Sequence, residues 1–290
     1  MGIPITYIFE FEKVEQDLWP FFMREFAAAG AGHLVLTQGL MMELLKDYRT
    51  IPSLKQEMAN AGLSFVDSHA VFGGAYDLQN YNDEMQELRS LAYRAQLRIA
   101  AEMGVDTITF HPGNDIADLD KPIEKLLDNV RANLEQLLPE AEKCGVTICL
   151  ENSWNIMSTP EYLLRIMNEF PTGRLGLCYD SGHANIMSGA GAGNQENGAI
   201  RRWAARGLEV KWNDHILEDM LPHVVNCHIH DNDGVKDLHL PPGQGCIDWK
   251  HIAQLLKKAP RLKCIQSEVK VLKNNVSIPS LCNTFNSMFA

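Results

Sequence analysis

The feature that most constrains the fold is a regular alternation between short apolar runs and longer segments with helical spacing. Each run is rich in β-branched and aromatic residues and ends in polar residues or glycine, which is typical of buried strands in a parallel sheet. Eight such runs occur in the 290 residues of the chain. They cover residues 4–11, 33–39, 63–70, 106–113, 146–153, 175–183, 224–231 and 264–270.

Between the runs, apolar residues recur at the three- and four-residue spacing of amphipathic helices. The clearest segments are residues 14–30, 84–104, 121–145 and 160–170, and the first three end in glycine, which accepts the left-handed conformation after a last helical turn. Eight strand-then-helix units in a chain of this length predict a single (β/α)8 barrel domain spanning residues 1–290. A doubly wound sheet is the alternative, and it is weakened because no G-x-G-x-x-G follows the first strand.

Charge and cysteine content narrow the class of protein. The formal net charge of −11 disfavours nucleic acid and anionic membranes as partners, because both repel an acidic surface. The seven cysteines are odd in number and form no C-x-x-C, so they indicate free thiols in a reducing compartment. The chain begins without a signal-like segment and has no run of membrane-spanning length, so we expect a cytoplasmic protein.

Three segments stand apart from the strand and helix pattern. Residues 187–198, MSGAGAGNQENG, are glycine-rich and aperiodic, and we interpret them as a loop insertion, with a mobile lid as the alternative. The only compact basic run, residues 201–206, is interpreted as a helix face, with a phosphate-binding lid as the alternative. The loop around Phe72, residues 70–82, is a candidate cover for a substrate.

Side chains that can bind a metal follow six consecutive strands. In a barrel the residues that end each strand meet at one face, so positions far apart in sequence become neighbours there. From the third run to the eighth, these residues are His69, His111, Glu151, Asp180 with His183 after it, His228 with Asp237 and His239 beyond, and Glu268.

Two of these acids, Glu151 and Glu268, directly follow the apolar residues of their strands, where the buried part of each strand is expected to end. A carboxylate so close to an apolar strand is costly unless a cation or hydrogen bonds compensate it. Together with Asp180 and His228, the two glutamates supply three carboxylates and one imidazole. That donor set suits Mn, Mg, Co or Zn, and its lack of thiolates disfavours a structural zinc site, so we predict a divalent metal site held by these four residues.

The seventh strand and the loop after it carry further candidates. His228 and His230 share strand parity, so both are expected to point inward while Asp231 points away. We rank His228 as the metal ligand and His230 as a contact to a ligand or to the substrate. Asp237 and His239 lie two apart in an extended loop, a spacing that presents both side chains to one ion or one sugar hydroxyl, with a solvated loop as the alternative.

At these strand ends the sequence resembles the xylose isomerase-like TIM barrel superfamily, which includes sugar and sugar-phosphate isomerases and epimerases as well as apurinic endonucleases. The resemblance runs from Ile5 to Glu268 through FHPG, LEN, YDSGHAN, CHIHD, DLHLPPGQG and SEV, and the order of these motifs is its specific part. It implies a single (β/α)8 TIM barrel. In the epimerase branch one divalent metal ion is held by Glu, Asp, His and Glu, which fall on Glu151, Asp180, His228 and Glu268.

The resemblance also implies an activity, that of a metal-dependent sugar isomerase or epimerase working through an enediolate on a small-molecule sugar or sugar phosphate. Glu151 and Glu268 would form the pair that removes and returns a proton, and His183 would contact the substrate. Trp154 is a candidate for stacking on a sugar face, with a core residue at the rim as the alternative. The sequence leaves open which sugar is bound and whether it is phosphorylated. It also leaves open the choice between isomerase, epimerase and dehydratase, and assembly into a homo-oligomer.

A zinc phosphodiesterase like the apurinic endonucleases is the alternative function. The endonuclease branch holds three zinc ions with a larger ligand set, and this chain offers a candidate at every position. The sequence around these residues departs from that branch, with ENSWN after the fifth strand and YDSGHAN where DTCH is expected. The acidic net charge also disfavours DNA as a partner. We therefore prefer the sugar enzyme. The larger set comprises His69, His111, Glu151, Asp180, His183, His228, Asp237, His239 and Glu268.

Overall fold

The computed structural model describes residues 2–80 and 84–289. Eight parallel strands close into a barrel in chain order, and the pairing of the first strand with the last completes the ring. This closure confirms the (β/α)8 TIM barrel and excludes the open doubly wound sheet. Each strand lies inside one of the eight predicted runs. The strands are β1 Ile5–Tyr7, β2 His33–Leu36, β3 Ser64–His69, β4 Thr107–Phe110, β5 Thr147–Glu151, β6 Leu175–Asp180, β7 Val224–Ile229 and β8 Cys264–Ser267.

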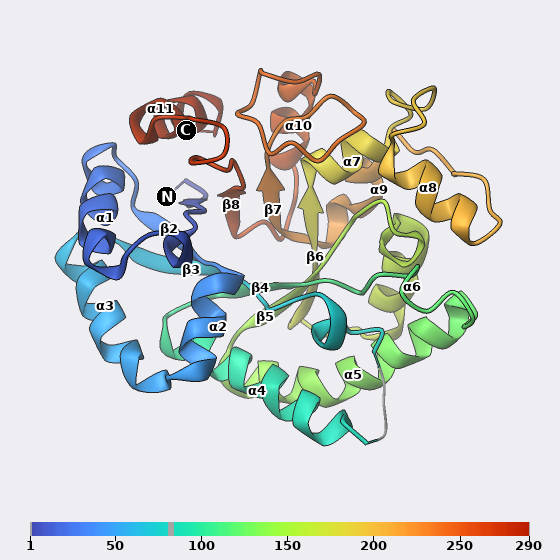
Figure 1. The fold of residues 1–290 in the computed structure, drawn as a ribbon, viewed down its shortest axis with the longest axis horizontal. Helices are drawn as coiled ribbons and strands as arrows, with labels where there is room; N and C mark the ends of the chain where they lie inside the picture. The colour runs from blue at the N-terminus through green and yellow to red at the C-terminus, as the bar shows by residue number, and fades with distance from the viewer. Residues whose placement is uncertain (1, 81–83, 290) are drawn as a thin grey trace.

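Helices surround the barrel on its outside (Figure 1). They are α1 Trp19–Ala28, α2 Gln38–Lys46, α3 Ile51–Asn60, α4 Gln86–Glu102, α5 Ile123–Cys144, α6 Pro160–Glu169, α7 Ser181–Met187, α8 Gly198–Ala205, α9 Ile216–Met220, α10 Trp249–Leu256 and α11 Ile278–Phe289. Short 3-10 turns lie at Phe11–Lys13, Gln16–Leu18, Tyr48–Thr50, Gly74–Tyr76, Ile156–Ser158 and Leu221–His223. Among the described residues, no helix combines the length and hydropathy needed to cross a membrane.

The four helical segments predicted from spacing correspond to α1, α4, α5 and α6. The first starts later than its pattern, at Trp19, with Pro20 in its first turn, where the missing N–H of proline leaves no hydrogen bond unmade. As predicted from the glycine that follows it, α5 ends at Cys144, and Gly145 has a φ of +73° in the left-handed region.

Residues 188–197 form turns between α7 and α8. Their last residue, Asn197, is fully buried and accepts a hydrogen bond from the N–H of Ala199 at 2.8 Å. Its side-chain amide donates to the carbonyl of Gly234 at 3.1 Å, which ties the segment to the loop after β7. That residues 187–198 are an insertion within one domain of residues 1–290 stays a prediction.

The loop after β7 is anchored by Asp231, which is buried and does not line the cavity at the barrel mouth. Its carboxylate accepts hydrogen bonds from the N–H of Gly243 and the indole N–H of Trp249, both at 2.8 Å. Because these contacts close the loop at both ends, they determine where Asp237 and His239 lie.

We expect Asp231→Ala to lower the free energy of unfolding by about 2 to 3 kcal/mol, because several N–H donors of the loop lose a charged acceptor. Urea denaturation followed by circular dichroism measures this loss. Asp233→Ala is the matched control: Asp233 accepts from Val235 and Lys236 in the same loop but is exposed, so its loss should stay near or below about 1 kcal/mol. Equal losses in the two variants would contradict the anchoring role.

Candidate metal centre

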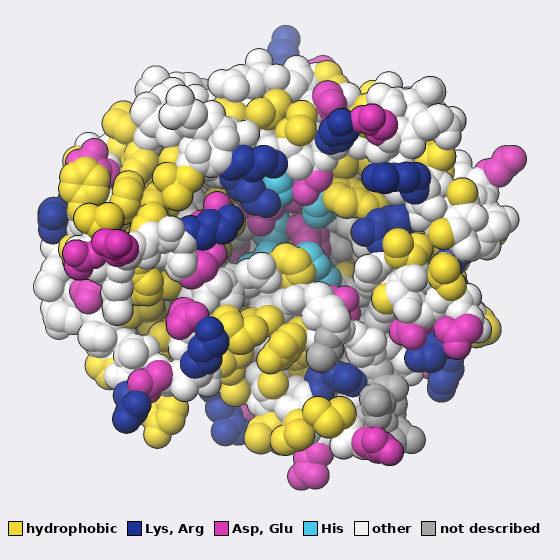
Figure 2. Space-filling view, viewed as in Figure 1, with side chains coloured by type: hydrophobic (Ala, Val, Ile, Leu, Met, Phe, Trp, Pro, Cys, Tyr) yellow, Lys and Arg dark blue, Asp and Glu magenta, His cyan; other side chains and the backbone are white. Residues whose placement is uncertain are grey.

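The carboxyl ends of the strands open onto a cavity of about 450 Å³. In Figure 2, histidine and carboxylate side chains lie at the bottom of a hollow, and Lys and Arg side chains lie around it. Three of the predicted site residues, Asp180, His228 and His230, are fully buried beneath the cavity. The others line it: His69, His111, Glu151, Trp154, His183, Asp237, His239 and Glu268.

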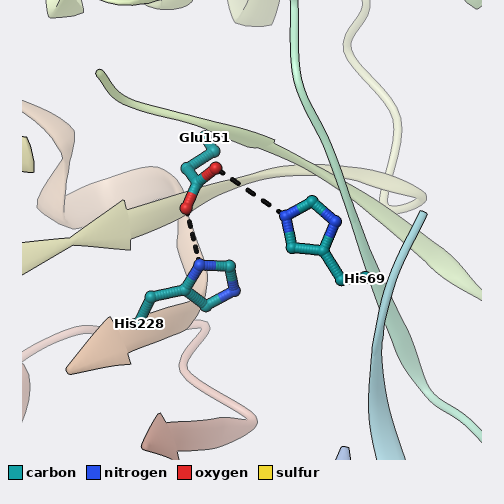
Figure 3. Close-up of side chains that lie close together, drawn as sticks. All are labelled: His69, Glu151 and His228. Atoms are coloured by element: carbon teal, nitrogen blue, oxygen red, sulfur yellow. Dashed lines mark hydrogen bonds and ion pairs between the residues drawn. The ribbon is translucent and has the colours of Figure 1, made fainter. Parts of the chain in front are cut away.

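Four predicted ligands meet at the floor of this cavity. Glu151 ends β5, Asp180 ends β6, His228 lies in β7 and Glu268 follows β8, and one donor atom from each lies within 4.8 Å of the others. His228 Nδ1 lies 2.6 Å from Glu151 Oε1, 3.2 Å from Glu268 Oε1 and 3.9 Å from Asp180 Oδ2. Figure 3 shows the His228 ring turned toward Glu151 from another strand. We call these four residues the quartet.

Within the quartet, the imidazole of His228 compensates part of the charge of the carboxylates. Burial by itself raises the pKa of the Glu151 carboxyl, but His228 and His111 outweigh this effect and hold that pKa well below its usual range. Burial likewise lowers the pKa of His228, yet the carboxylates of Glu268, Glu151 and Asp180 outweigh it and raise the pKa to about 10. The contacts at the floor therefore favour an ionised carboxylate at Glu151.

The donor set of the quartet fits a divalent metal ion. Three carboxylates against one imidazole leave an excess of negative charge when the acids are ionised, and a dication offsets it. Close by, Asp237 Oδ1 and His230 Nδ1 are buried without a hydrogen-bond partner among the described residues. Clusters of potential metal ligands are thus present in the fold, and the binding of a metal by the quartet stays a prediction.

Two further histidines contact the other oxygen of Glu151. His111 Nε2 lies 2.6 Å from Glu151 Oε2, and His69 Nε2 lies 3.9 Å from the same atom (Figure 3 shows His69). Phe72 packs against both rings, with centroid separations of 4.2 Å to His111 and 4.9 Å to His69. The start of the loop predicted as a cover therefore borders the site, while residues 81 and 82 of that loop lie outside the described residues.

A second group lies on the side of Asp180. His183 Nδ1 is 3.6 Å from Asp180 Oδ1, and His183 Nε2 is 3.9 Å from Asp237 Oδ2. His239 Nε2 is 2.9 Å from the same Asp237 oxygen, and its Nδ1 lies 2.9 Å from the Glu268 carbonyl oxygen. The backbone of His239 has a φ of +53°, which is uncommon for a residue with a side chain. Asp237 and His239 thus border the cavity as a pair.

His230 supports the site from below. Its Nε2 lies 3.2 Å from Asp180 Oδ2, and its ring stacks on His239 at 4.1 Å. A side chain at Gly182 would collide with this ring, because a Cβ there would lie 2.0 Å from the His230 Cε1. Of these two histidines, only His228 contacts both glutamates, and its ranking above His230 as the metal ligand stays a prediction.

The sequence reasoning missed a polar column inside the barrel beneath His228. Thr109 Oγ1 lies 3.3 Å from His228 Nε2, and the Asn226 amide donates to Thr109 Oγ1 at 2.9 Å and to Asp67 Oδ1 at 3.1 Å. An Nε2–H that donates to Thr109 leaves Nδ1 as the nitrogen facing the carboxylates. The overlooked signal was parity, since Asn226 precedes His228 and Asp67 precedes His69 by two residues within their strands.

We expect Thr109→Val to weaken binding of Mn²⁺ or Zn²⁺ by about 10-fold or more while retaining the fold, because valine keeps the shape and removes the partner of His228 Nε2. Competition with a fluorescent chelator measures the affinity. Thr107→Val is the control on the same strand, because Thr107 donates to Asp67 and not to His228. Similar affinities for the Thr109→Val protein and the wild type would contradict the orienting role of Thr109.

Two curated relatives align with parts of the chain. Uncharacterized protein MJ1311 of Methanocaldococcus jannaschii is 28% identical over 199 residues, which span 67% of this chain and 61% of that protein. Probable endonuclease 4 of Citrifermentans bemidjiense is 26% identical over 136 residues, which span 45% of this chain and 46% of that protein. The chain therefore matches less than two thirds of the length of either relative.

Solved structures share the fold over nearly the whole chain. A D-tagatose 3-epimerase-like protein superposes with a TM-score of 0.73 at 20% identity, covering 100% of this chain and 97% of that one. The IolI protein with a bound zinc atom superposes with a TM-score of 0.68 at 17% identity, covering 99% and 96%. The family model for the xylose isomerase-like TIM barrel matches residues 25–265. This protein therefore belongs to the xylose isomerase-like TIM barrel family.

Proposed function

We propose that this protein is a divalent-metal-dependent isomerase or epimerase that acts on a sugar or sugar phosphate. The observation that carries the proposal is the buried quartet of Glu151, Asp180, His228 and Glu268 at the floor of the cavity. The fold is shared with a D-tagatose 3-epimerase-like protein and with a D-psicose 3-epimerase, which supports a small-molecule sugar as substrate. The oligomeric state and a cytoplasmic location stay predictions.

The quartet residues would hold one Mn, Mg, Co or Zn ion. When bound there, a divalent ion supplies Lewis acidity that polarises a substrate carbonyl and makes the neighbouring C–H acidic. Glu151 and Glu268 come from β5 and β8 and both line the cavity, so each is in place to exchange a proton with the substrate. Return of the proton to the opposite face gives an epimer, and return to the adjacent carbon gives an isomer.

Glu268 is the better placed of the two acids to take the first proton. Both oxygens of Glu151 lie 2.6 Å from a histidine nitrogen, one at His228 and one at His111. Glu268 Oε1 accepts from Gln266 at 2.8 Å, whereas the shortest ion-pair distance of its Oε2 is 3.8 Å, to His239 Nδ1. The freer oxygen makes Glu268 the base, and Glu151 remains a tightly held partner.

The aromatic side chains that line the cavity also suit a sugar. Trp154 and Phe72 both line it, and Trp154 meets the ring of His183 edge to face at 4.8 Å. Aromatic faces beside a polar floor can cover the C–H face of a sugar while its hydroxyls contact the polar groups. Trp154, His183 and His239 are accordingly proposed as substrate contacts.

We expect Glu268→Gln to slow exchange of substrate carbon-bound hydrogen with solvent deuterium by about 100-fold or more, because glutamine retains the shape of glutamate and cannot act as a base. A screen of ketoses, aldoses and their phosphates in D2O, read by NMR, measures the exchange. Glu102→Gln, at the exposed end of α4, is the control and should exchange at the wild-type rate. Wild-type exchange by Glu268→Gln would refute the assigned proton transfer.

A zinc phosphodiesterase is the second candidate function, and one observation favours it. Ligand-type residues flank the quartet on both sides, with His69 and His111 against Glu151, and with Asp237 and His239 beside His183. A single-metal isomerase does not require these additional donors. The partial alignment with a probable endonuclease 4 agrees with this candidate.

Metal analysis separates the two functions. The isomerase predicts one divalent ion per chain and exchange activity that chelation abolishes. The phosphodiesterase predicts two or three zinc ions per chain and nicking of DNA at abasic sites. Inductively coupled plasma mass spectrometry of the purified protein, combined with both activity assays, measures the difference. Two or three zinc ions per chain together with abasic-site nicking would replace the isomerase proposal by the second candidate.

A further inference from the structure

The three arginines of the basic run, residues 201–206, have three different environments. Arg201 is exposed on α8. Arg206, directly after α8, donates to the main-chain carbonyls of Asp115 and Lys121 and so holds that segment in place. Arg202 is half-buried and lines the cavity above the quartet. The interpretation of the run as a plain helix face therefore leaves Arg202 unexplained.

Within residues 2–80 and 84–289, the guanidinium of Arg202 has only neutral hydrogen-bond partners. Its Nη1 donates to Asn114 Oδ1 at 2.5 Å and to Asn155 Oδ1 at 2.9 Å, and no carboxylate of the described residues lies within ion-pair distance. Burial lowers the pKa of Arg202, and Asp115 only partly opposes this effect. The Asp115 carboxylate accepts from main-chain N–H groups of the loop after β5. Arg202 is thus a partly desolvated cation without a direct counter-ion.

The neighbouring amides leave this end of the cavity with hydrogen-bond donors. Because the Oδ1 atoms of Asn114 and Asn155 accept hydrogen bonds from Arg202, the Nδ2 groups of these amides are left to donate to other partners. Asn155 Nδ2 donates to Ser153 Oγ at 3.0 Å, whereas Asn114 Nδ2 has no hydrogen-bond partner among the described residues. A guanidinium beside a free amide N–H2 complements an acceptor with negative charge, and the planar fork of arginine matches the oxygens of a phosphate.

We propose that the substrate is a phosphorylated sugar and that Arg202 and Asn114 bind its phosphate beneath α8, while the sugar carbons reach the quartet. The inference rests on the proposed isomerase function and narrows its substrate class. A phosphate ester carries close to two negative charges at neutral pH, which compensates the charge of Arg202 beyond the partial effect of Asp115.

Three further charged residues that line the cavity leave this assignment intact. Lys270 follows Glu268 by two residues and comes from the β8 side of the barrel, away from the loops after β4 and β5 that hold Arg202. Glu10 forms an ion pair with Lys13. The Glu12 carboxyl packs against Gly39 at the start of α2, where a Cβ on that glycine would collide with it.

The packing of α8 favours a small ligand over DNA. The Trp203 indole donates to the Trp154 carbonyl at 3.2 Å, and Gly198 lies against the Trp154 ring, so α8 covers the loop after β5. The net charge of −11 opposes a polyanion, while a single phosphate requires only a local cation.

The first test measures binding of inorganic phosphate to the metal-free protein by isothermal titration calorimetry, so that no bound metal contributes. We expect Arg202→Met to weaken phosphate binding by about 10-fold or more. The affinity of Arg202→Lys, which keeps the charge and loses the planar fork, should lie between those of the wild type and Arg202→Met. Arg201→Met is the matched control and should bind within about twofold of wild type. Thermal unfolding checks that each variant is folded. Unchanged binding in Arg202→Met, or a loss confined to Lys270→Met, overturns the proposal.

The second test compares deuterium exchange on D-ribulose 5-phosphate and D-fructose 6-phosphate with exchange on the free sugars. The wild type should prefer the phosphates, and Arg202→Met should raise KM for the phosphates while leaving the free sugars unchanged. Equal wild-type use of free and phosphorylated sugars overturns the inference and leaves the isomerase standing. Arg202-dependent phosphate binding without exchange on any sugar contradicts the proposed function and supports the anion site. Arg202-dependent nicking of abasic DNA overturns the sugar-phosphate assignment.

Discussion

Charge compensation between buried carboxylates and imidazoles is the interaction on which the rest of the site depends. Glu151 is 3% exposed and places one oxygen against His228 and the other against His111. Groups so far from water are unfavourable unless each finds an opposite charge or a hydrogen bond, and the loss of one partner leaves the other uncompensated. The closed barrel meets this requirement because its strand ends bring residues from distant parts of the chain to one point and hold them rigidly.

The site is built in layers with different tasks. The polar column of Asp67, Asn226 and Thr109 lies inside the barrel and orients His228 from below. The quartet forms the floor, where proton transfer is proposed. Loops after the strands form the walls, and Arg202 on α8 brings a partly desolvated cation to them. Chemistry in the floor and selectivity in the walls are thus carried by separate elements, as is usual when barrel loops vary over a shared scaffold.

The fold, and which residues lie at the floor of the cavity, were predictable from sequence. The eight runs read as parallel strands because such strands are buried on both faces, and the acids and histidines were recognisable because they follow those runs. Parity within a strand separated His228 from Asp231 correctly. The same parity would also have identified Asn226 and Asp67, but polar residues inside an apolar strand are ambiguous until the barrel interior is known to hold them. The sequence did not show which of Arg201 and Arg202 lines the cavity, because helical spacing does not tell which face of a helix meets a cavity.

By itself the sequence determined the order of the strands, the residue types at their ends and therefore the kind of chemistry available, since these depend on local periodicity and on the composition of each segment. The tertiary structure alone decided which donor atoms meet, that His230 lies under Asp180 while His111 borders the cavity, and that the charge of Arg202 has no carboxylate within ion-pair distance among the described residues. These outcomes depend on closure of the ring and on the packing of loops over it. They arise from contacts between residues far apart in the chain, and no local pattern encodes them.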